Sequence, residues 1–349
     1  MPTEHKLTNR HTIASYFAGA HLHNGVCLGG NEQQILALAG LTHAQLKHPK
    51  SRILATQLSS IVKSCWRISG DELLGFTQQK VKVGMFNLLA ERLIRCKTLT
   101  EALAYSVVFY NLTGDQLQIK VERRSSQVCV SVNANFKSSS DRTSPNSVLT
   151  ELLLLICHRF PSWLVGRVIP LNQIHVKHVK PTHHEEYRLM FPCPCIYQST
   201  DNMLVFDAKY LDLPVVQTPE EWVKYANQIP LQWFKKQSYN DTCSAQVIRV
   251  LESSLLGKGS NLDNVAAKLN MTSRTLRRKL IVEGSRFQQL KDNTRRDKAI
   301  YLFEQADLTI AQIGLALGFT ELATFSRAFK HWTGLSPNTY RNHHSLTSR

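Results

Sequence analysis

The same alternation of hydrophobic and polar positions occurs twice near the C-terminal end of the chain, at 262–280 and 308–330. In each copy a short segment with helical periodicity is followed by a turn and a second helical segment rich in Ser, Thr, Arg and Lys. The pairs Leu276/Leu280 and Phe325/Phe329 are spaced to face inward from the second segments. The pattern predicts two helix-turn-helix units, which place their second helix in the major groove of DNA. A generic helical hairpin would explain either copy taken alone.

The turns of the two copies carry matching residues. Asn270 and Gly318 occupy the turns, where we expect left-handed backbone that glycine adopts freely and asparagine tolerates. Thr272 and Thr320 follow and are expected to cap the second helices. The offset between the copies is 48 positions before the turn and 49 after it, so the second copy carries one extra residue.

The segment between the copies, 286–305, has a helical stripe of apolar residues. A single helix of that length spans about 30 Å at 1.5 Å per residue. One repeat of the major groove is about 34 Å. We therefore expect one long helix to set both recognition helices into successive grooves on one face of DNA.

The rest of the chain mixes helical and strand patterns after a weakly patterned start over residues 1–30. Helices are expected at 32–46, 52–68, 85–96, 100–112, 148–160 and 182–190, and strands at 117–121, 128–132, 173–179 and 203–206. These elements predict an α+β domain over 15–215. A polar connector with Trp222 and Trp233 is expected at 216–242, and an all-α domain with two helix-turn-helix units joined by a long helix at 243–345.

The chain carries a formal net charge of +16, which favours a polyanionic partner. Residues from Asp241 onward hold 16 of the 42 basic and 9 of the 26 acidic residues, a net +7, so charge alone does not locate the site. The eight cysteines include no CxxC pair, which favours free thiols in a reducing cytoplasm. The start lacks the apolar segment of a signal peptide, and the apolar run at 152–157 is too short to cross a bilayer. We expect a cytoplasmic protein with no membrane partner.

Residues from Asn261 to Arg341 resemble the C-terminal DNA-binding domain of the AraC/XylS family of bacterial transcription regulators. The resemblance is carried by VAAKLNMTSRTLRRKL, RRDKAIYLF, IGLALGFTELATFSRAFKHWTG and LSPNTYR. Asn270 departs from the glycine that is usual in the family. KTLTEALAYSVVFYNL, IHVKHVKPTHHEEYRLMF and NMLVFDAKYLDLP are similar to the arabinose-binding-type sensor domain of some members, rather than to the cupin barrel of others. That family label says little about the ligand of this chain.

The resemblance implies which residues meet DNA in the first copy. Arg274, Arg277 and Arg278 are expected to read bases, because an arginine can donate two hydrogen bonds to guanine. Ser273, Thr275 and Lys279 are expected to reach phosphate. A solvated basic face without a reading role is the alternative for the arginines.

The second recognition helix offers a different set of side chains. Its exposed face is expected to carry Leu322, Ala323, Thr324, Ser326, Arg327 and Lys330. Leu322 and Ala323 suit thymine methyl groups, whereas Arg327 and Lys330 suit the DNA backbone. The first copy is therefore expected to supply most of the specificity, and the second more of the uniform affinity. Arg295 matches an arginine of the family's connecting helix and is expected to be structural.

The N-terminal half offers candidate residues for other chemistry. His175, His178, His183 and His184 cluster in the sequence, but their spacing and that of Cys193 and Cys195 fit no zinc pattern, so no metal is expected. No catalytic triad, P-loop or GxGxxG is present, and we expect neither a cofactor nor an enzyme. The aromatic residues Trp66, Phe86, Phe160 and Trp163 either line an apolar pocket or form core.

These observations predict a sequence-specific DNA-binding transcription regulator, an activator by family habit. Its expected partners are double-stranded DNA, RNA polymerase and a small-molecule effector in the N-terminal domain, with a homodimer also open. The alternative is a ligand-independent regulator whose N-terminal domain only dimerises. A third hypothesis, an enzyme with a DNA-targeting domain, lacks a catalytic constellation.

Overall fold

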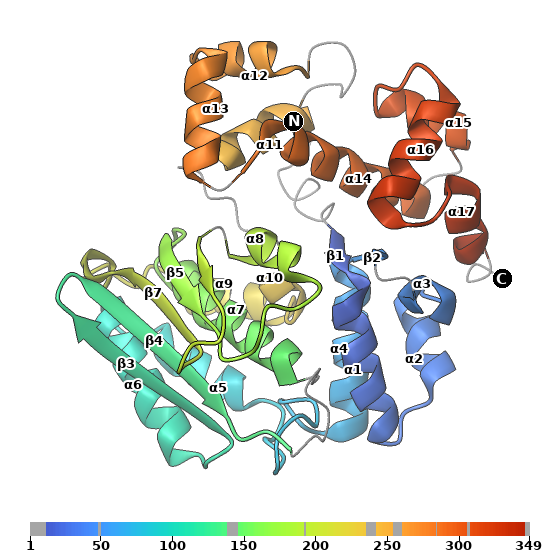
Figure 1. Cartoon of the computed structure of the whole chain (residues 1–349). Helices are drawn as coiled ribbons and strands as arrows, with labels where there is room; N and C mark the ends of the chain where they lie inside the picture. Colours follow the sequence, from blue (N-terminus) through green and yellow to red (C-terminus); the bar gives the residue numbers. More distant parts are fainter. Residues whose placement is uncertain are drawn as a thin grey trace. The chain divides into compact units, whose positions relative to one another are not determined.

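The computed structural model describes residues 12–47, 50–137, 146–191, 193–234, 242–253, 260–283, 285–305 and 308–345. The chain forms two compact units (Figure 1). The sheet unit comprises Gly19–Ile35 and Ser59–Gln237, and the helical unit comprises Met1–Ala18, Leu36–Leu58 and Ser238–Arg349. An early segment of the chain therefore belongs to the same compact unit as the two helix-turn-helix copies.

A five-stranded sheet in the order β3-β4-β7-β5-β6 organises the sheet unit. Its strands are β3 (Leu117–Arg124), β4 (Gln127–Ala134), β5 (Leu171–His175), β6 (Cys195–Ile196) and β7 (Met203–Asp207). Neighbours are antiparallel except β5 and β6, which are parallel. The strands predicted at 117–121 and 128–132 are present and form an antiparallel hairpin, β3–β4. They extend further than expected because Ser125, at φ 53°, turns the chain within two residues. The two-residue β6 was not predicted, since so short a strand has no period.

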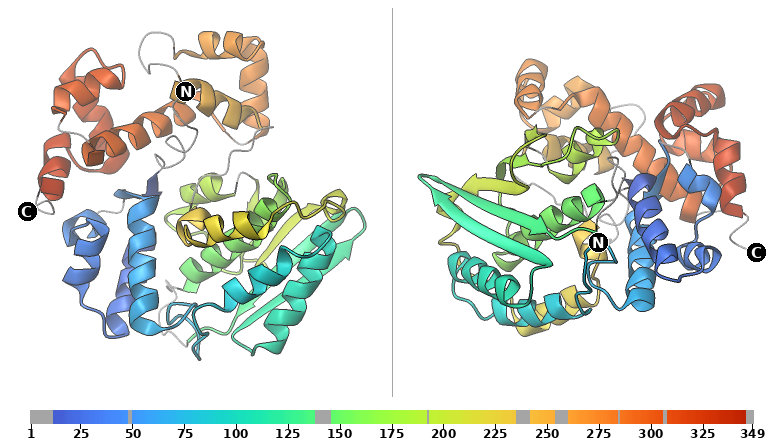
Figure 2. Two further views of the ribbon diagram at one scale, coloured as in Figure 1. Left: turned by 180° about the vertical axis from the view of Figure 1, so that it is seen from behind. Right: turned by 60° about the horizontal axis from the view of Figure 1, so that its bottom comes forward.

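Helix α5 (Met85–Leu93) packs on α6 (Leu99–Leu112), and α6 and α7 (Asn146–Leu164) pack on the hairpin. Both views in Figure 2 show α5 and α6, in cyan and teal, alongside it. Helix α6 begins where predicted, because the Thr98 side chain accepts a hydrogen bond from the Glu101 N–H at 3.3 Å. The expected helix at 182–190 is instead a 3-10 turn, His184–Glu186, followed by the short helix α8 (Tyr187–Met190). Residues 138–145, between the hairpin and α7, lie outside the described residues.

The stretch expected as a polar connector holds two packed helices, α9 (Pro219–Ala226) and α10 (Leu231–Phe234). Trp222 and Trp233 on these helices are buried in the sheet unit. The Phe86 ring lies 5.4 Å from that of Trp233 and 4.9 Å from that of Phe160, centroid to centroid. These aromatic contacts explain why residues up to 237 group with the sheet unit.

The first seventy residues depart from the predicted elements. The weakly patterned start holds the strand β1 (Thr12–Ala14) and the helix α1 (Ser15–Cys27). The helix expected at 32–46 is two helices, α2 (Glu32–Ala39) and α3 (His43–Lys47), because Gly40 adopts φ 64° between them. The helix expected at 52–68 begins later, as α4 (Ala55–Ser69), because Arg52–Leu54 forms a strand, β2, that pairs antiparallel with β1.

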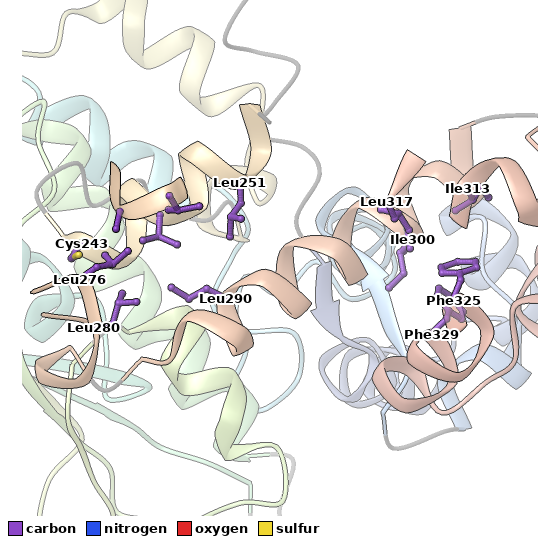
Figure 3. Packing of buried hydrophobic residues seen from close by; sticks show 14 of the residues in the cluster. Cys243, Leu251, Leu276, Leu280, Leu290, Ile300, Ile313, Leu317, Phe325 and Phe329 are labelled. Atoms are coloured by element: carbon purple, nitrogen blue, oxygen red, sulfur yellow. The ribbon is translucent and has the colours of Figure 1, made fainter. Parts of the chain in front are cut away.

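In the described residues of 242–345, the helical unit contains seven helices. They are α11 (Cys243–Ser253), α12 (Leu262–Lys268), α13 (Ser273–Val282), α14 (Phe287–Gln305), α15 (Ile310–Ala316), α16 (Leu322–Thr333) and α17 (Pro337–Ser345). Figure 3 shows buried side chains gathered at both ends of α14, with Leu276, Leu280 and Leu290 at one end and Phe325 and Phe329 at the other. The predicted inward pairs and the predicted single connecting helix are both confirmed.

The first strands of the chain brace α14. We call residues 12–18 and 36–58 the N-terminal brace, which includes β1, β2 and α3. Within the helical unit, β2 contacts α14, α3 contacts α17, and Leu54 joins the hydrophobic core. The Gln57 Nε2 lies 3.5 Å from Glu304 Oε2 on α14. In the described part of the chain, no helix combines the length and the hydropathy needed to cross a membrane.

Candidate DNA interface

The first helix-turn-helix is held in shape by local hydrogen bonds. Asn261 caps α12 by accepting a hydrogen bond from the Asn264 N–H at 2.8 Å. Asn270 adopts φ 54° in the turn, as predicted, and the Met271 N–H donates to the Ala266 carbonyl at 2.9 Å. Thr272 then caps α13, because its hydroxyl accepts the Thr275 N–H at 3.2 Å. The turn therefore fixes the direction in which α13 leaves it.

The second copy repeats this geometry with one difference. Gly318 adopts φ 81°, and the Phe319 N–H donates to the Gly314 carbonyl at 3.0 Å, as in the first copy. A Cβ at Gly314 would lie 3.3 Å from the Phe325 ring, so glycine lets α15 and α16 approach closely. The predicted cap by Thr320 is wrong: Glu321 holds that position and makes no side-chain cap bond. The extra residue in the second turn accounts for this, because it moves the helix start one position along.

Helix α13 presents a strongly basic face. Arg274, Arg277, Arg278 and Lys279 are exposed, whereas Leu276 and Leu280 are buried. None of the three arginines forms an ion pair with a carboxylate in the described part of the chain. Their guanidinium groups are therefore available to an external partner that accepts hydrogen bonds.

The hydroxyl groups on α13 are already engaged within the first copy. Ser273 is half-buried, and its hydroxyl donates to Asp263 Oδ1 on α12. Thr275 Oγ1 lies 3.0 Å from Thr272 Oγ1. Contacts of Ser273 and Thr275 with phosphate stay predictions. To make them, each hydroxyl would have to share or exchange its hydrogen bond to Asp263 or Thr272.

Helix α16 presents fewer cations. Leu322, Ala323, Thr324, Arg327 and Lys330 are exposed, and Ser326 is half-buried. The Arg327 Nη2 lies 3.4 Å from Thr324 Oγ1, one turn earlier. The two recognition helices thus differ in the structure as they do in sequence, with four exposed cations on α13 and two on α16.

Helix α14 joins the two copies over 19 residues, a length of about 28 Å at 1.5 Å per residue. The Arg295 guanidinium lies 4.9 Å from the centroid of the Phe319 ring in the second turn. Burial lowers the pKa of Arg295 below its ordinary value. This position agrees with the structural role expected for Arg295.

The closing segment finishes the core beside the second copy. Tyr340 is 1% exposed, and its ring lies 5.3 Å from that of Phe329 and 5.4 Å from that of Phe303. The Arg341 Nη2 donates to the Leu308 carbonyl at 2.5 Å. These contacts join α17 to α14, to α16 and to the segment before α15.

His183 and His178 belong to a hydrogen-bond network around the buried Glu151. The Tyr187 hydroxyl donates to Glu151 Oε1 at 2.5 Å, and His183 Nε2 lies 2.9 Å from the same oxygen. His178 Nε2 lies 2.8 Å from the Tyr187 hydroxyl, and His175 Nδ1 lies 3.1 Å from Ser199 Oγ. Within the described ranges, no group of three or more His, Cys, Asp or Glu side chains has an arrangement that could hold a metal ion.

Of the four aromatic residues proposed for a pocket, two line one. Phe86 and Phe160 border a cavity of about 310 Å³ in the sheet unit, whereas Trp66 and Trp163 are not among its lining residues. Glu72, Tyr110 and Trp233 also line it and were not singled out from sequence. A lone carboxylate and a tyrosine in apolar surroundings carry no motif, so only the fold reveals that they share a space.

The fold and the two basic recognition helices define a DNA-binding transcription regulator. Residues 29–215 match the family model of the arabinose-binding domain of AraC transcription regulators, and residues 265–343 match a helix-turn-helix domain model. The chain belongs to the AraC family of transcription regulators.

Three regulators of Pseudomonas aeruginosa are similar to this chain in sequence or structure. The chain is 22% identical over 316 residues to the ornithine utilization regulator of Pseudomonas aeruginosa, covering 90% of this chain and 91% of that protein. It is 24% identical over 229 residues to the regulator VqsM of the same species, covering 63% of this chain and 67% of VqsM. The solved structure of the P. aeruginosa regulator CdpR aligns over 93% of this chain and 98% of that chain, with 18% identity and a TM-score of 0.33.

Proposed function

We propose that α13 reads the bases of the target site and that α16 mainly supplies uniform affinity for the DNA backbone. The carrying observation is the set of three exposed arginines on α13, held in a helix whose direction is fixed by its turn. Each guanidinium that pairs with a guanine contributes about 1–3 kcal/mol of discrimination. Arg327 and Lys330 on α16 suit phosphate contacts, which position a protein without specifying a base.

Binding assays with base-substituted versions of a target site test this division of roles. The protein with Arg277→Ala should lose affinity for the best site and discriminate less at one base position. The protein with Lys330→Ala should lose affinity for every site by a similar factor. Arg95→Ala removes an exposed arginine in the sheet unit and serves as the control. If Lys330→Ala relaxed specificity more than Arg277→Ala did, the proposed roles would have to be reversed.

The chain is also proposed to be a one-component activator that acts in the cytoplasm and is not an enzyme. Within 15–215, the part that belongs to the sheet unit would sense a small-molecule effector, and 243–345 would bind DNA and meet RNA polymerase. Helices α9 and α10 of 216–242 would belong to the sensor, because they pack in the sheet unit. The cavity in the sheet unit supports an effector, because ligand sites are mostly apolar spaces of about 300–1000 Å³. An effector that binds one conformation better than another shifts the population towards it.

The alternative is that the sheet unit only dimerises and the protein binds DNA without a ligand. Thermal unfolding against a library of metabolites separates the two functions, since a ligand that binds the folded state stabilises it by RT ln(1 + [L]/Kd). Stabilisation by a compound that also changes DNA affinity supports the effector. A concentration-dependent dimer with no ligand response would favour the alternative.

A further inference from the structure

The cavity of the sheet unit lies between α5, α6, α7 and the β3–β4 hairpin, whose positions Figure 1 shows. Each of these elements supplies an apolar side chain to its wall: Leu89, Leu103, Leu153, Ile119 and Val132. Protein interiors are packed about as densely as organic crystals, so a space of about 310 Å³ is far larger than an ordinary packing void. An apolar cavity of about 150 Å³ in another protein binds benzene, so a cavity of about twice that volume has room for about twelve carbon atoms.

One end of the cavity is polar and is held in place by the chain. It is lined by Glu72, Gln79, Lys80, Lys82 and Gln116. The Gln79 N–H donates to Gln116 Oε1 at 2.9 Å, and the Glu72 N–H donates to the Val81 carbonyl at 2.6 Å. The Lys80 Nζ donates to the Ser69 carbonyl at 2.9 Å. An apolar body with one polar end is the shape that receives an amphiphile.

Two polar groups have unused hydrogen-bonding capacity inside this space. The Glu72 carboxylate accepts the Phe86 N–H at 3.0 Å and the Gly84 N–H at 3.3 Å, and its two oxygens offer about four acceptor positions in total. In the described part of the chain, the Tyr110 hydroxyl makes no hydrogen bond to protein. Burial raises the pKa of Glu72 to about 7 and the pKa of Tyr110 well above its ordinary value, the latter further because of the nearby Glu72 charge. Glu72 and Tyr110 therefore share one low-dielectric space.

We propose that this cavity binds an apolar molecule of about ten to twelve carbon atoms that carries one hydrogen-bond-donating head group, a hydroxyl or an amine, received by Glu72 and Tyr110. The apolar body would lie against the wall formed by α5, α6, α7 and the hairpin. Taking this molecule as the effector rests on the proposed function, whereas its binding to the cavity does not.

A donor head group fits this end better than a carboxylate. A ligand carboxylate beside Glu72 would bring two like charges together in apolar surroundings, which raises the cost of ionising either one. Burial and the Asp71 charge already raise the pKa of Glu72, so a second carboxylate would add to that cost. A ligand hydroxyl or ammonium instead donates to the carboxylate and needs no change in the rim.

The test measures thermal unfolding and Trp fluorescence of the full-length protein with 1-decanol, decylamine or decanoate, each below its micellar concentration. Trp233 lines the cavity and is 3% exposed, so its emission reports occupancy. We expect decanol and decylamine to raise the unfolding temperature and change the emission. Decanoate should bind at least about tenfold more weakly, a difference of 1.4 kcal/mol.

Two variants test the head-group contacts. Tyr110→Phe should weaken the binding of decanol and of decylamine. Tyr105→Phe makes the same change at an exposed position of α6 and should leave the binding of both compounds unchanged. Glu72→Gln keeps an acceptor but removes the charge, so decylamine should weaken about tenfold and decanol much less. Circular dichroism and DNA binding without ligand establish that each variant is folded.

The outcomes separate this inference from the proposed function. The ligand class is wrong if decanoate binds as tightly as decanol, or if Tyr110→Phe binds all three compounds like the wild type. The absence of any stabilisation or fluorescence change with the ten-carbon series overturns the site itself. Binding of decanol or decylamine without a change in DNA affinity would leave the site standing and remove its effector role.

Discussion

Thr12 and Asp297 are 285 positions apart, and the Thr12 hydroxyl donates a hydrogen bond of 2.5 Å to Asp297 Oδ1 on α14. The same hydroxyl accepts a bond from Arg52 Nε at 2.7 Å, and Arg296 Nη2 lies 3.0 Å from Asp297 Oδ1. The side chains of Asp297 and Arg296 are 18% and 11% exposed, so these charged bonds are shielded from water. The N-terminal brace is thus bonded to the helix that joins the two DNA-binding copies.

Asp297→Ala should destabilise the helical unit by about 1–3 kcal/mol, because it leaves half-buried polar partners without their acceptor. Urea unfolding followed by circular dichroism measures the change. Asp292→Ala on the same helix is the control and should cost less, because the Asp292 carboxylate accepts hydrogen bonds from the exposed Gln288. An equal loss of unfolding free energy in the two variants would show that the bond from Asp297 to the N-terminal brace adds no stability.

The half-buried Glu304 should make the helical unit less stable as pH rises. Burial raises its pKa from an ordinary 4.5 to about 7, although Gln57 opposes the shift, and Tyr340 lies close enough to feel its charge. Because folding raises the pKa of Glu304, its protonated form favours the folded state. The contribution of Glu304 to the free energy of unfolding is therefore complete below pH 4.5 and is lost as pH rises through 7. Wild type should therefore lose stability relative to Glu304→Gln between these values. Urea midpoints across that range check the slope, and the exposed Glu321→Gln should keep the wild-type slope.

Gly318→Ala should destabilise the second helix-turn-helix by about 1–2 kcal/mol, because its φ of 81° brings a Cβ too close to the following carbonyl. Gly19→Ala is the matched control. Gly19 lies inside α1 with no atom within 4 Å of an added Cβ, so alanine there should be neutral or stabilising by up to about 1 kcal/mol. Thermal unfolding of both variants measures the contrast, and a change of the same sign in both would refute the left-handed requirement.

The salt dependence of DNA binding should report the cations on the recognition helices. Removing one phosphate contact lowers the slope of log affinity against log salt by about 0.9. Lys330→Ala should show this reduction on every DNA sequence, whereas Arg95→Ala should leave the slope unchanged. A Lys330→Ala slope equal to that of wild type would exclude a phosphate contact for Lys330.

Elements with a strong local signal were predictable from sequence. The inward pairs Leu276/Leu280 and Phe325/Phe329, the left-handed Asn270 and Gly318 and the long α14 all follow from periodicity and backbone preference over short distances. The arginine-rich exposed face of α13 and the arginine-poor exposed face of α16 follow from the same periodicity. These features depend on neighbours within a few residues, which the sequence displays directly.

Features that depend on distant partners were not predictable. Arg52–Leu54 has a helical pattern, yet it is a strand because Thr12–Ala14 pairs with it some forty positions away. Glu72 and Tyr110 belong to no motif and meet only because the segment before α5 folds beside α6. Tertiary pairing outweighs local preference in the first case and creates the candidate pocket in the second.

The position of Leu54 in the core of the helical unit bears on how such proteins can be recombined. A chimera that joins a foreign sensor to this chain at residue 238 would keep both helix-turn-helix copies and discard the apolar side chain and hydrogen bonds supplied by residues 12–58. The portable module is therefore discontinuous in sequence. An exchange between relatives should carry β1, β2 and α3 together with the C-terminal helices, so that α14 keeps the partners with which it folds.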